Sequence, residues 1–135
     1  LGDRLGGHIV QGHVDGVGVV ESVLPEGSGS RVRVRFPAEL ADCVVLKGSI
    51  AVDGVSLTVA AREGLLFEVA LIPETLEITR LREYAPGTPV NLEVDMMGRY
   101  VVEYLKGRLA PGRPDPAVTR EHLIRHGFVG GERAP

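Results

Sequence analysis

The stretch KGSIAVDGVSLTV, residues 47–59, carries three polar side chains that could hold a ligand: Lys47, Ser56 and Thr58. Ser56 and Thr58 lie two residues apart, so both point to the same face of a β-strand. An ammonium group and two hydroxyls could together bind a polar ligand that lies against a sheet edge. A β-hairpin with ordinary Ser and Thr on its solvent face fits the same pattern, and the stretch alone leaves both interpretations open.

His8 and His13 are the other candidates for chemistry, since a histidine titrates near neutral pH and can carry a proton. Five residues apart on a regular strand, they would point to opposite faces, and no third metal ligand is nearby in the sequence. A metal site is therefore not expected. We expect a structural role for His8. His13 stays a candidate, because the backbone of Gly12 and Val14 beside it could approach a ligand closely.

Two further patterns that suggest ligands have more ordinary explanations. The glycines at positions 12, 16 and 18 lack the G-x-G-x-x-G spacing, and no helix is expected after them, so they do not form a dinucleotide-binding loop. Arg31, Arg33 and Arg35 would share one strand face, where they could bind an anion. A solvated outer face that discourages edge aggregation is the usual role of such residues.

The composition of the 135 residues is that of a globular domain, with 24% charged and 44% hydrophobic residues. A formal net charge of −3 gives no reason to expect nucleic acid. Cys43 is the single cysteine, which excludes an internal disulfide and fits a cytoplasmic location. No stretch has the roughly 20 apolar residues of a membrane span, and no secretory signal is expected. The chain begins at Leu1 without a methionine, and we expect it to be a piece of a longer protein.

Period-two alternation of apolar residues predicts strands up to residue 95. The predicted strands are residues 1–24 (long, bent and bulged at glycines), 30–36, the two arms of a hairpin at 47–59 with its turn at Asp53-Gly54, 65–72, and 90–95 with Asn91, Glu93 and Asp95 facing outward. Pro37 is expected to begin a helical turn, and a short helix is expected over 77–84. About six short strands separated by turns predict an all-β fold, a six-stranded closed antiparallel Greek-key barrel with short helical turns.

After the barrel, the apolar period changes to that of a helix. One stripe contains Met97, Tyr100, Val101, Tyr104 and Leu105. Gly107 is expected as the C-cap of this helix, and a second short helix is expected to begin at Asp115 or Thr119 and to end at Gly127. The predicted organisation is a barrel at 1–96 and a C-terminal helical segment at 97–135. Because the stripe has little left to cover on a small barrel, we expect this segment to join subunits.

Several separated stretches, taken in order, resemble one protein family. They are GGHIVQGHVDGVG (residues 6–18), KGSIAVDGVSLTV (47–59), LIPETLEITRL (71–81) and VNLEVD (90–95). Together they closely resemble the C-terminal barrel of riboflavin synthase, and residues 121–128 are similar to the tail of that family. The resemblance covers nearly the whole chain.

The resemblance implies a protein of two similar six-stranded barrels, with a C-terminal helix that joins three subunits into a homotrimer. The family converts two molecules of 6,7-dimethyl-8-ribityllumazine into riboflavin and 5-amino-6-(D-ribitylamino)uracil. A four-carbon unit passes from one lumazine to the other, with no cofactor and no metal. Each barrel binds one lumazine, and the reaction needs an N-terminal barrel that faces the C-terminal barrel of a neighbouring subunit.

The family pattern assigns roles to residues of this chain. His13 in QGHVDG is the expected proton carrier, Asp95 in VNLEVD its acidic counterpart, and Thr58 a third catalytic residue. The residues expected to bind the lumazine are Gly12, His13, Val14, Lys47, Ser56, Leu57, Thr58, Leu71, Ile72, Pro73, Glu74, Thr75 and Leu76. Because the lumazine ring is electrophilic and its 7-methyl group is acidic, such a site mainly orients two rings and moves protons.

The chain departs from the family in lacking the N-terminal barrel, and with it the cysteine motif that stands where this chain has Val55-Ser56. We therefore expect it to bind one ribityllumazine or riboflavin without completing the reaction. Two alternatives remain: an antenna-type protein that binds one chromophore without catalysis, and a structural unit that assembles a trimer. The presence of both His13 and Asp95 argues against the antenna protein, which would be expected to lose them.

Overall fold

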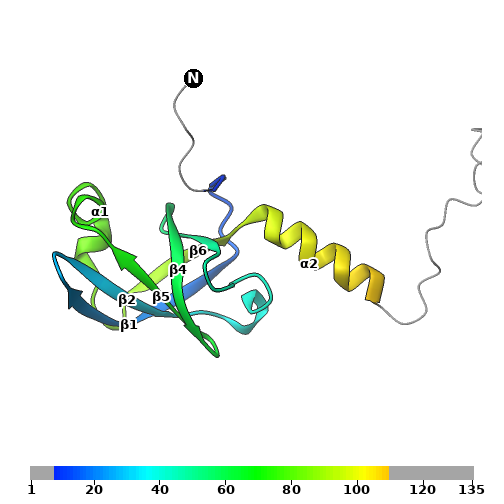
Figure 1. The fold of residues 1–135 in the computed structure, drawn as a ribbon, viewed down its shortest axis with the longest axis horizontal. Helices are drawn as coiled ribbons and strands as arrows, with labels where there is room; N and C mark the ends of the chain where they lie inside the picture. Colours follow the sequence, from blue (N-terminus) through cyan, green and yellow to red (C-terminus); the bar gives the residue numbers. More distant parts are fainter. Residues whose placement is uncertain (1–7, 110–135) are drawn as a thin grey trace, which may run out of the picture. The chain divides into compact units, whose positions relative to one another are not determined.

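The computed structural model describes residues 8–109 of the chain. Within them, six strands form a closed barrel in the order β1-β2-β5-β4-β3-β6, and all neighbouring strands are antiparallel (Figure 1). The strands are β1 (Gly16–Glu26), β2 (Gly29–Arg35), β3 (Ser49–Val52), β4 (Val55–Glu63), β5 (Leu66–Leu71) and β6 (Pro89–Val94). This confirms the predicted closed barrel. Contacts divide the chain into two compact units between Glu103 and Tyr104, and the barrel belongs to the first.

The barrel interior is filled by the apolar residues of the alternating strand pattern. Val34, Phe67 and Leu92 are 0% exposed, and Ile50 is 1% exposed. Most of the core is valine or another aliphatic residue, which suits the narrow interior of a small barrel. Burial of each such side chain contributes roughly 1.5–3 kcal/mol relative to exposure. The inward residues therefore provide the main force that closes the barrel.

The hairpin of β3 and β4 has the predicted turn. Asp53 and Gly54 have positive φ angles of 47° and 80°, as a two-residue Asp-Gly hairpin turn requires. The Asp53 carboxylate accepts a hydrogen bond from the Asn91 backbone N–H at 2.8 Å and another from the Tyr84 hydroxyl at 2.6 Å. These bonds tie the turn to β6 and to the segment that precedes β6.

The predicted N-terminal strand over 1–24 is too long. β1 begins at Gly16, and residues 8–15 form an irregular segment that we call the arm. The register between β1 and β2 shifts between Val20 and Ser22 rather than at a glycine. Gly18 serves close packing instead, since a Cβ there would lie 2.8 Å from the carbonyl oxygen of Arg35.

Short helices occupy two of the connections between strands. A 3-10 helix, η1 (Ala38–Leu40), follows Pro37 as predicted, and α1 (Pro73–Ile78) with η2 (Arg80–Glu83) connects β5 to β6. The predicted helix over 77–84 is wrong in its start. The helix begins at Pro73, because proline is favoured in a first helical turn, and the extended backbone of Thr79 separates α1 from η2.

The helix α2 (Met96–Leu109) confirms the prediction of a helix after the barrel. The Asp95 side chain accepts a hydrogen bond from the Met97 N–H at 2.9 Å and so caps the first turn. Gly107 is wrong as a C-cap: it lies within α2, where a glycine costs only about 1 kcal/mol relative to alanine. The apolar stripe is exposed, from 49% at Leu105 to 66% at Met97. The second predicted helix lies outside the described residues.

Candidate functional site

Three strands bring Ser56, Ala51 and Glu93 side by side. The register pairs Ser56 of β4 with Ala51 of β3, and Ala51 with Glu93 of β6. Their neighbours Ile50 and Val94 pack into the barrel core, so these three side chains point outward. We call Ser56, Ala51 and Glu93 the outer row. Ala51 is nevertheless only 1% exposed, which indicates that the outer row is covered.

The arm crosses the outer row, and His8 contacts its first member. His8 Nδ1 lies 2.8 Å from the Ser56 Oγ, and the His8 backbone N–H donates to the same hydroxyl at 3.4 Å. The Nε2 atom of His8 is buried and has no hydrogen-bond partner among the described residues. His8, for which the sequence indicated a structural role, therefore contacts a hydroxyl that is predicted to bind a ligand.

Glu93 holds the middle of the arm. Glu93 points outward as predicted, yet the residue is only 7% exposed. Its two carboxylate oxygens accept hydrogen bonds from successive backbone N–H groups, that of Gln11 at 2.6 Å and that of Gly12 at 2.9 Å. Glu93 points away from the core, as strand alternation requires, and is buried because the arm lies over it.

Asp15 fastens the end of the arm to β6. Its backbone N–H donates to the Leu92 carbonyl oxygen at 2.8 Å, and its Oδ2 accepts from the Val94 N–H at 2.9 Å. Its other carboxylate oxygen pairs with the guanidinium group of Arg99. The arm is thus held at its start, its middle and its end.

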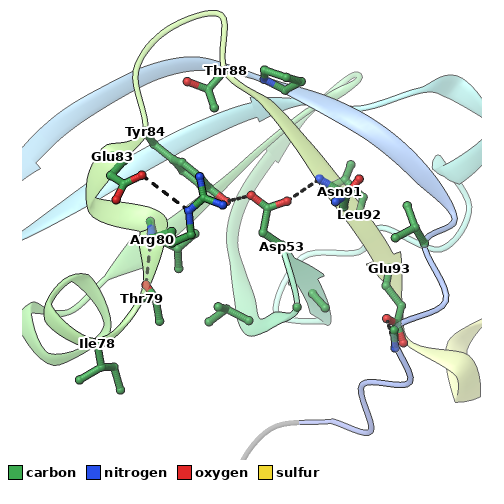
Figure 2. A pocket seen from close by; sticks show the side chains of 17 residues that line it. Asp53, Ile78, Thr79, Arg80, Glu83, Tyr84, Thr88, Asn91, Leu92 and Glu93 are labelled. Atoms are coloured by element: carbon green, nitrogen blue, oxygen red, sulfur yellow. Dashed lines mark hydrogen bonds and ion pairs between the residues drawn. The ribbon is translucent and has the colours of Figure 1, made fainter.

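A cavity of about 830 Å³ lies beside the arm, against the outer side of β3 and β6. Figure 2 shows Arg80, Glu83 and Tyr84 on one side, Asn91, Leu92 and Glu93 on the other, and Asp53 between them. Gly12 and Val14 of the arm also line the cavity. Its size is within the range of small-molecule sites, and its walls carry several groups that form hydrogen bonds.

Tyr84 is a fixed part of the wall of this larger cavity. Burial and the hydrogen bond to Asp53 raise the pKa of Tyr84 well above its ordinary value. The hydroxyl therefore stays protonated at neutral pH and keeps donating to Asp53 (Figure 2). Tyr84 can shape this cavity and position the hairpin turn, but it is not suited to release a proton.

His13 lies in a second, smaller cavity of about 460 Å³. Its Nδ1 lies 3.3 Å from the side-chain oxygen of Gln11. Asp15 and Arg99 line this cavity too, and Glu93 lines both cavities. The buried carboxylate that holds the arm therefore lies between the larger cavity and the cavity that contains the predicted proton carrier.

The predicted site residues are spread over several surroundings. Gly12 and Val14 line the larger cavity and His13 the smaller one, whereas Asp95 caps α2. Asp95 lies between β6, which ends at Val94, and α2, which begins at Met96.

The predicted residues of the hairpin lie on both faces of β4. Thr58 is exposed and pairs with Ser49 of β3, on the same outer face as Ser56. Leu57 points inward and packs against the core. Lys47 has a φ of 63°, and its backbone N–H donates to the Val59 carbonyl oxygen at 2.9 Å, which extends the hairpin ladder past Thr58.

The predicted stretch of residues 71–76 turns from β5 into α1. Leu71 is 2% exposed and belongs to the core, while Ile72 is 58% exposed. Pro73 and Glu74 lie in the first turn of α1, the Thr75 carbonyl accepts a hydrogen bond from the Thr79 hydroxyl at 2.6 Å, and Leu76 packs against the core. Ile72 is thus the member of this stretch that offers a large apolar surface to solvent.

Sequence reasoning missed Glu93, Asp53 and Tyr84 as residues that shape the site. The sequence does offer a signal for Asp53, because an Asp in a turn often accepts hydrogen bonds from backbone N–H groups. Glu93 and Tyr84 have none, because their roles depend on the arm and on η2 lying over the barrel.

Neither a metal centre nor a membrane helix is found in the part of the chain that the structure describes. No three His, Cys, Asp or Glu side chains are grouped there so that they could hold a metal ion. Likewise, no helix within residues 8–109 is long and apolar enough to cross a membrane.

Comparisons with known proteins agree with the resemblance seen in the sequence. The riboflavin synthase of Mycobacterium tuberculosis (strain ATCC 25618 / H37Rv) is 51% identical over 109 residues, which cover 78% of this chain and 54% of that protein. The riboflavin synthase of Actinobacillus pleuropneumoniae is 36% identical over 125 residues, covering 93% of this chain and 58% of that protein. The chain thus spans about half the length of the curated relatives it matches.

Solved structures with the same fold contain flavin and lumazine ligands. The structure of LumP complexed with flavin mononucleotide has a TM-score of 0.62 and 28% identity, covering 67% of this chain and 50% of that one. LumP complexed with 6,7-dimethyl-8-(1'-D-ribityl) lumazine has a TM-score of 0.60 and 29% identity, covering 64% of this chain and 48% of that one. The family model described as "Lumazine binding domain" matches residues 11–95, which include the second half of the arm and the whole barrel, so the chain belongs to the lumazine-binding domain family.

Proposed function

We propose that this chain is the C-terminal lumazine-binding barrel of a riboflavin synthase and binds one molecule of 6,7-dimethyl-8-ribityllumazine or riboflavin. The observation that carries the proposal is 51% identity to a riboflavin synthase over 109 residues. The flavin and lumazine complexes of LumP, which has a similar fold, support the ligand class. The proposed enzyme is cytoplasmic and uses neither a cofactor nor a metal.

The outer face of β4 is the proposed place for the ligand. Ser56 and Thr58 point outward there, and Lys47 extends the same hairpin. The hydroxyls and the ammonium group would bind the polar edge of the ring or the ribityl chain, and Ile72 at the end of β5 would cover the ring. The His8 ring forms a hydrogen bond with the Ser56 hydroxyl, so a ligand that binds this hydroxyl in its place must displace His8.

The proposed chemistry needs two lumazines held ring against ring. Such orientation supplies roughly 7–11 kcal/mol of the barrier reduction in favourable cases. In the proposal His13 moves the proton, Asp95 is its acidic counterpart and Thr58 is a third catalytic residue, and a second barrel from a neighbouring subunit supplies the other lumazine. The exposed stripe on α2 supports assembly of a homotrimer through this helix.

The test is to add the missing partner. The 135-residue chain is mixed with ribityllumazine, and riboflavin is followed by its absorbance and by chromatography. We expect no riboflavin from the chain alone and steady formation after the N-terminal barrel of a related riboflavin synthase is added. Riboflavin formation by the chain alone would contradict the proposal.

A second candidate function is a chromophore-binding protein without catalysis, favoured by the likeness to the LumP complexes. The same experiment separates the two candidates. A chain that binds ribityllumazine but stays inactive with several N-terminal barrels would support the second candidate.

A further inference from the structure

Glu93 is a buried acid that none of the three proposed catalytic roles uses. It is 7% exposed, and burial of a carboxylate is costly unless hydrogen bonds replace its water. Both of its oxygens accept backbone N–H groups of the arm, at 2.6 Å from Gln11 and 2.9 Å from Gly12. Hydrogen bonds to a charged acceptor are the stronger kind, so this pair fixes the arm firmly.

The local backbone of the arm suits this contact. Gly12 has a φ of +76°, which glycine adopts without strain. A Cβ at Gly12 would meet nothing within 4 Å, so the glycine serves the backbone conformation and not close packing. That conformation lets two successive N–H groups point toward one carboxylate.

The position of this contact ties it to His13. His13 follows Gly12 directly in the chain, and Glu93 lines both the larger cavity and the smaller cavity that contains His13. The neighbouring contacts of the arm are His8 with Ser56 on one side and Asp15 with Val94 on the other. Without Glu93, the arm between these two contacts would lose its attachment to the barrel, while Asp15 would still hold it at β6.

We propose that Glu93 is a positioning residue, which holds Gln11 and Gly12 and thereby fixes the place of the His13 ring in the smaller cavity. That the position of His13 matters for catalysis rests on the proposed function. That Glu93 sets this position is independent of it.

The first experiment measures position in the 135-residue chain. In Glu93→Gln, one of the two acceptor oxygens becomes an NH2 group that faces an N–H. We expect amide hydrogen exchange at Gln11 and Gly12 to become at least about tenfold faster, and the ring signals of His13 to shift in NMR spectra. Amides of the core strand β5 should keep their protection, because the barrel itself is unchanged. Glu39→Gln is the matched control, since Glu39 is exposed on η1 and lines neither cavity.

A second variant acts from the side of the arm. Gly12→Pro removes one donor N–H and cannot adopt the positive φ, so it should free Gln11 and shift the His13 signals while leaving Glu93 in place. If Glu93→Gln fails to fold, this variant decides the question. Unchanged exchange at Gln11 and unchanged His13 signals in the folded variants would overturn the proposal.

The second experiment measures the catalytic consequence in the mixture with an N-terminal barrel. We expect Glu93→Gln to lower kcat while KM stays near its wild-type value, and Glu93→Gln with His13→Gln to lose no more than His13→Gln alone. Faster exchange with an unchanged kcat would overturn the step from the position of the arm to catalysis. A wild-type mixture without activity counts against the proposed function alone, and exchange and the His13 signals then decide whether Glu93 positions the arm.

Discussion

At the scale of single residues, two carboxylates organise the outside of the barrel. Glu93 accepts two N–H groups of the arm, and Asp53 joins its own turn to β6 and to Tyr84. Strand alternation predicts that Glu93 points outward, and the Asp-Gly pair predicts the turn. Neither pattern predicts that the arm covers Glu93 or that Tyr84 contacts Asp53. These two contacts join segments that are far apart in the sequence, so the local pattern of residues could not predict them.

Tyr84→Phe tests the contribution of the Asp53 contact to stability. The variant removes the hydroxyl that donates to Asp53 at 2.6 Å, and we expect it to lower the free energy of unfolding by about 1 kcal/mol in urea titrations. Because the pKa of Tyr84 is raised on folding, the wild type should also lose stability as the pH rises above about 10, the ordinary tyrosine value. Tyr84→Phe should lose less over that range. Tyr100→Phe, at an exposed position of α2, is the control, and an equal effect of both variants would refute this reading.

His13→Gln tests the proposed proton carrier. Glutamine keeps a polar side chain of similar size but cannot take up a proton near neutral pH. In the mixture with an N-terminal barrel, we expect riboflavin formation to fall by roughly 10²- to 10⁴-fold, with lumazine binding to the chain mostly intact. Steady-state rates and a fluorescence titration measure the two quantities, and unchanged turnover would remove His13 from the mechanism.

At the scale of elements, the strands were the most predictable part of the chain. Alternation correctly indicated 30–36, the hairpin at 47–59 and 90–95, because one face of each is buried in the barrel. The arm differs from the predicted strand. Its valine and isoleucine residues favour a strand, but the N–H groups of Gln11 and Gly12 donate to the Glu93 side chain and not to a neighbouring strand. The helix before β6 begins four residues earlier than predicted, because Pro73 starts its first turn.

The outer faces of β1, β2 and β5 carry ion pairs of the three arginines, for which the sequence had indicated a solvated outer face. Arg31 and Arg33 both contact Glu68, and Arg35 contacts Glu21 at 2.7 Å. Hydrogen bonds from Arg33 and Arg31 hold the pKa of Glu68 below its ordinary value, although burial acts the other way. The three arginines of this face are therefore paired with carboxylates of the neighbouring strands, so the face needs no bound anion.

Glu68→Gln tests these pairs through pH. Because folding lowers the pKa of Glu68, its contribution is present above the unfolded value near 4.5 and is lost as the pH falls through the lower folded value. We expect the variant to be less stable at pH 7 by no more than about 1 kcal/mol, and this difference to vanish in acid. Urea titrations between pH 7 and 3 measure it. The exposed Glu77→Gln is the control, and a stability difference that persists unchanged at pH 3 would contradict the assignment.

At the scale of the whole molecule, the chain spans about half the length of its curated relatives, and its described residues contain one barrel. A reaction between two lumazines requires two binding faces. In the proposal, this barrel therefore provides one binding face, and a second barrel provides the other.

Removal of residues 97–135 tests the proposed role of the C-terminal segment. The stripe on α2 exposes large apolar side chains, as expected for a surface that another subunit covers. We expect the 135-residue chain to sediment as a trimer and a chain ending at residue 96 to sediment as a monomer. The same particle mass per chain in both, with the barrel folded, would exclude this segment as the trimer contact.

Titration of the 135-residue chain with 6,7-dimethyl-8-ribityllumazine, followed by the fluorescence of the ligand, tests the central claim most directly. The proposed site predicts saturable binding of one lumazine per chain, weakened when both β4 hydroxyls are removed in Ser56→Ala with Thr58→Ala. Absence of saturable binding, or binding that this double variant leaves unchanged, would contradict a lumazine site on the outer face of β4.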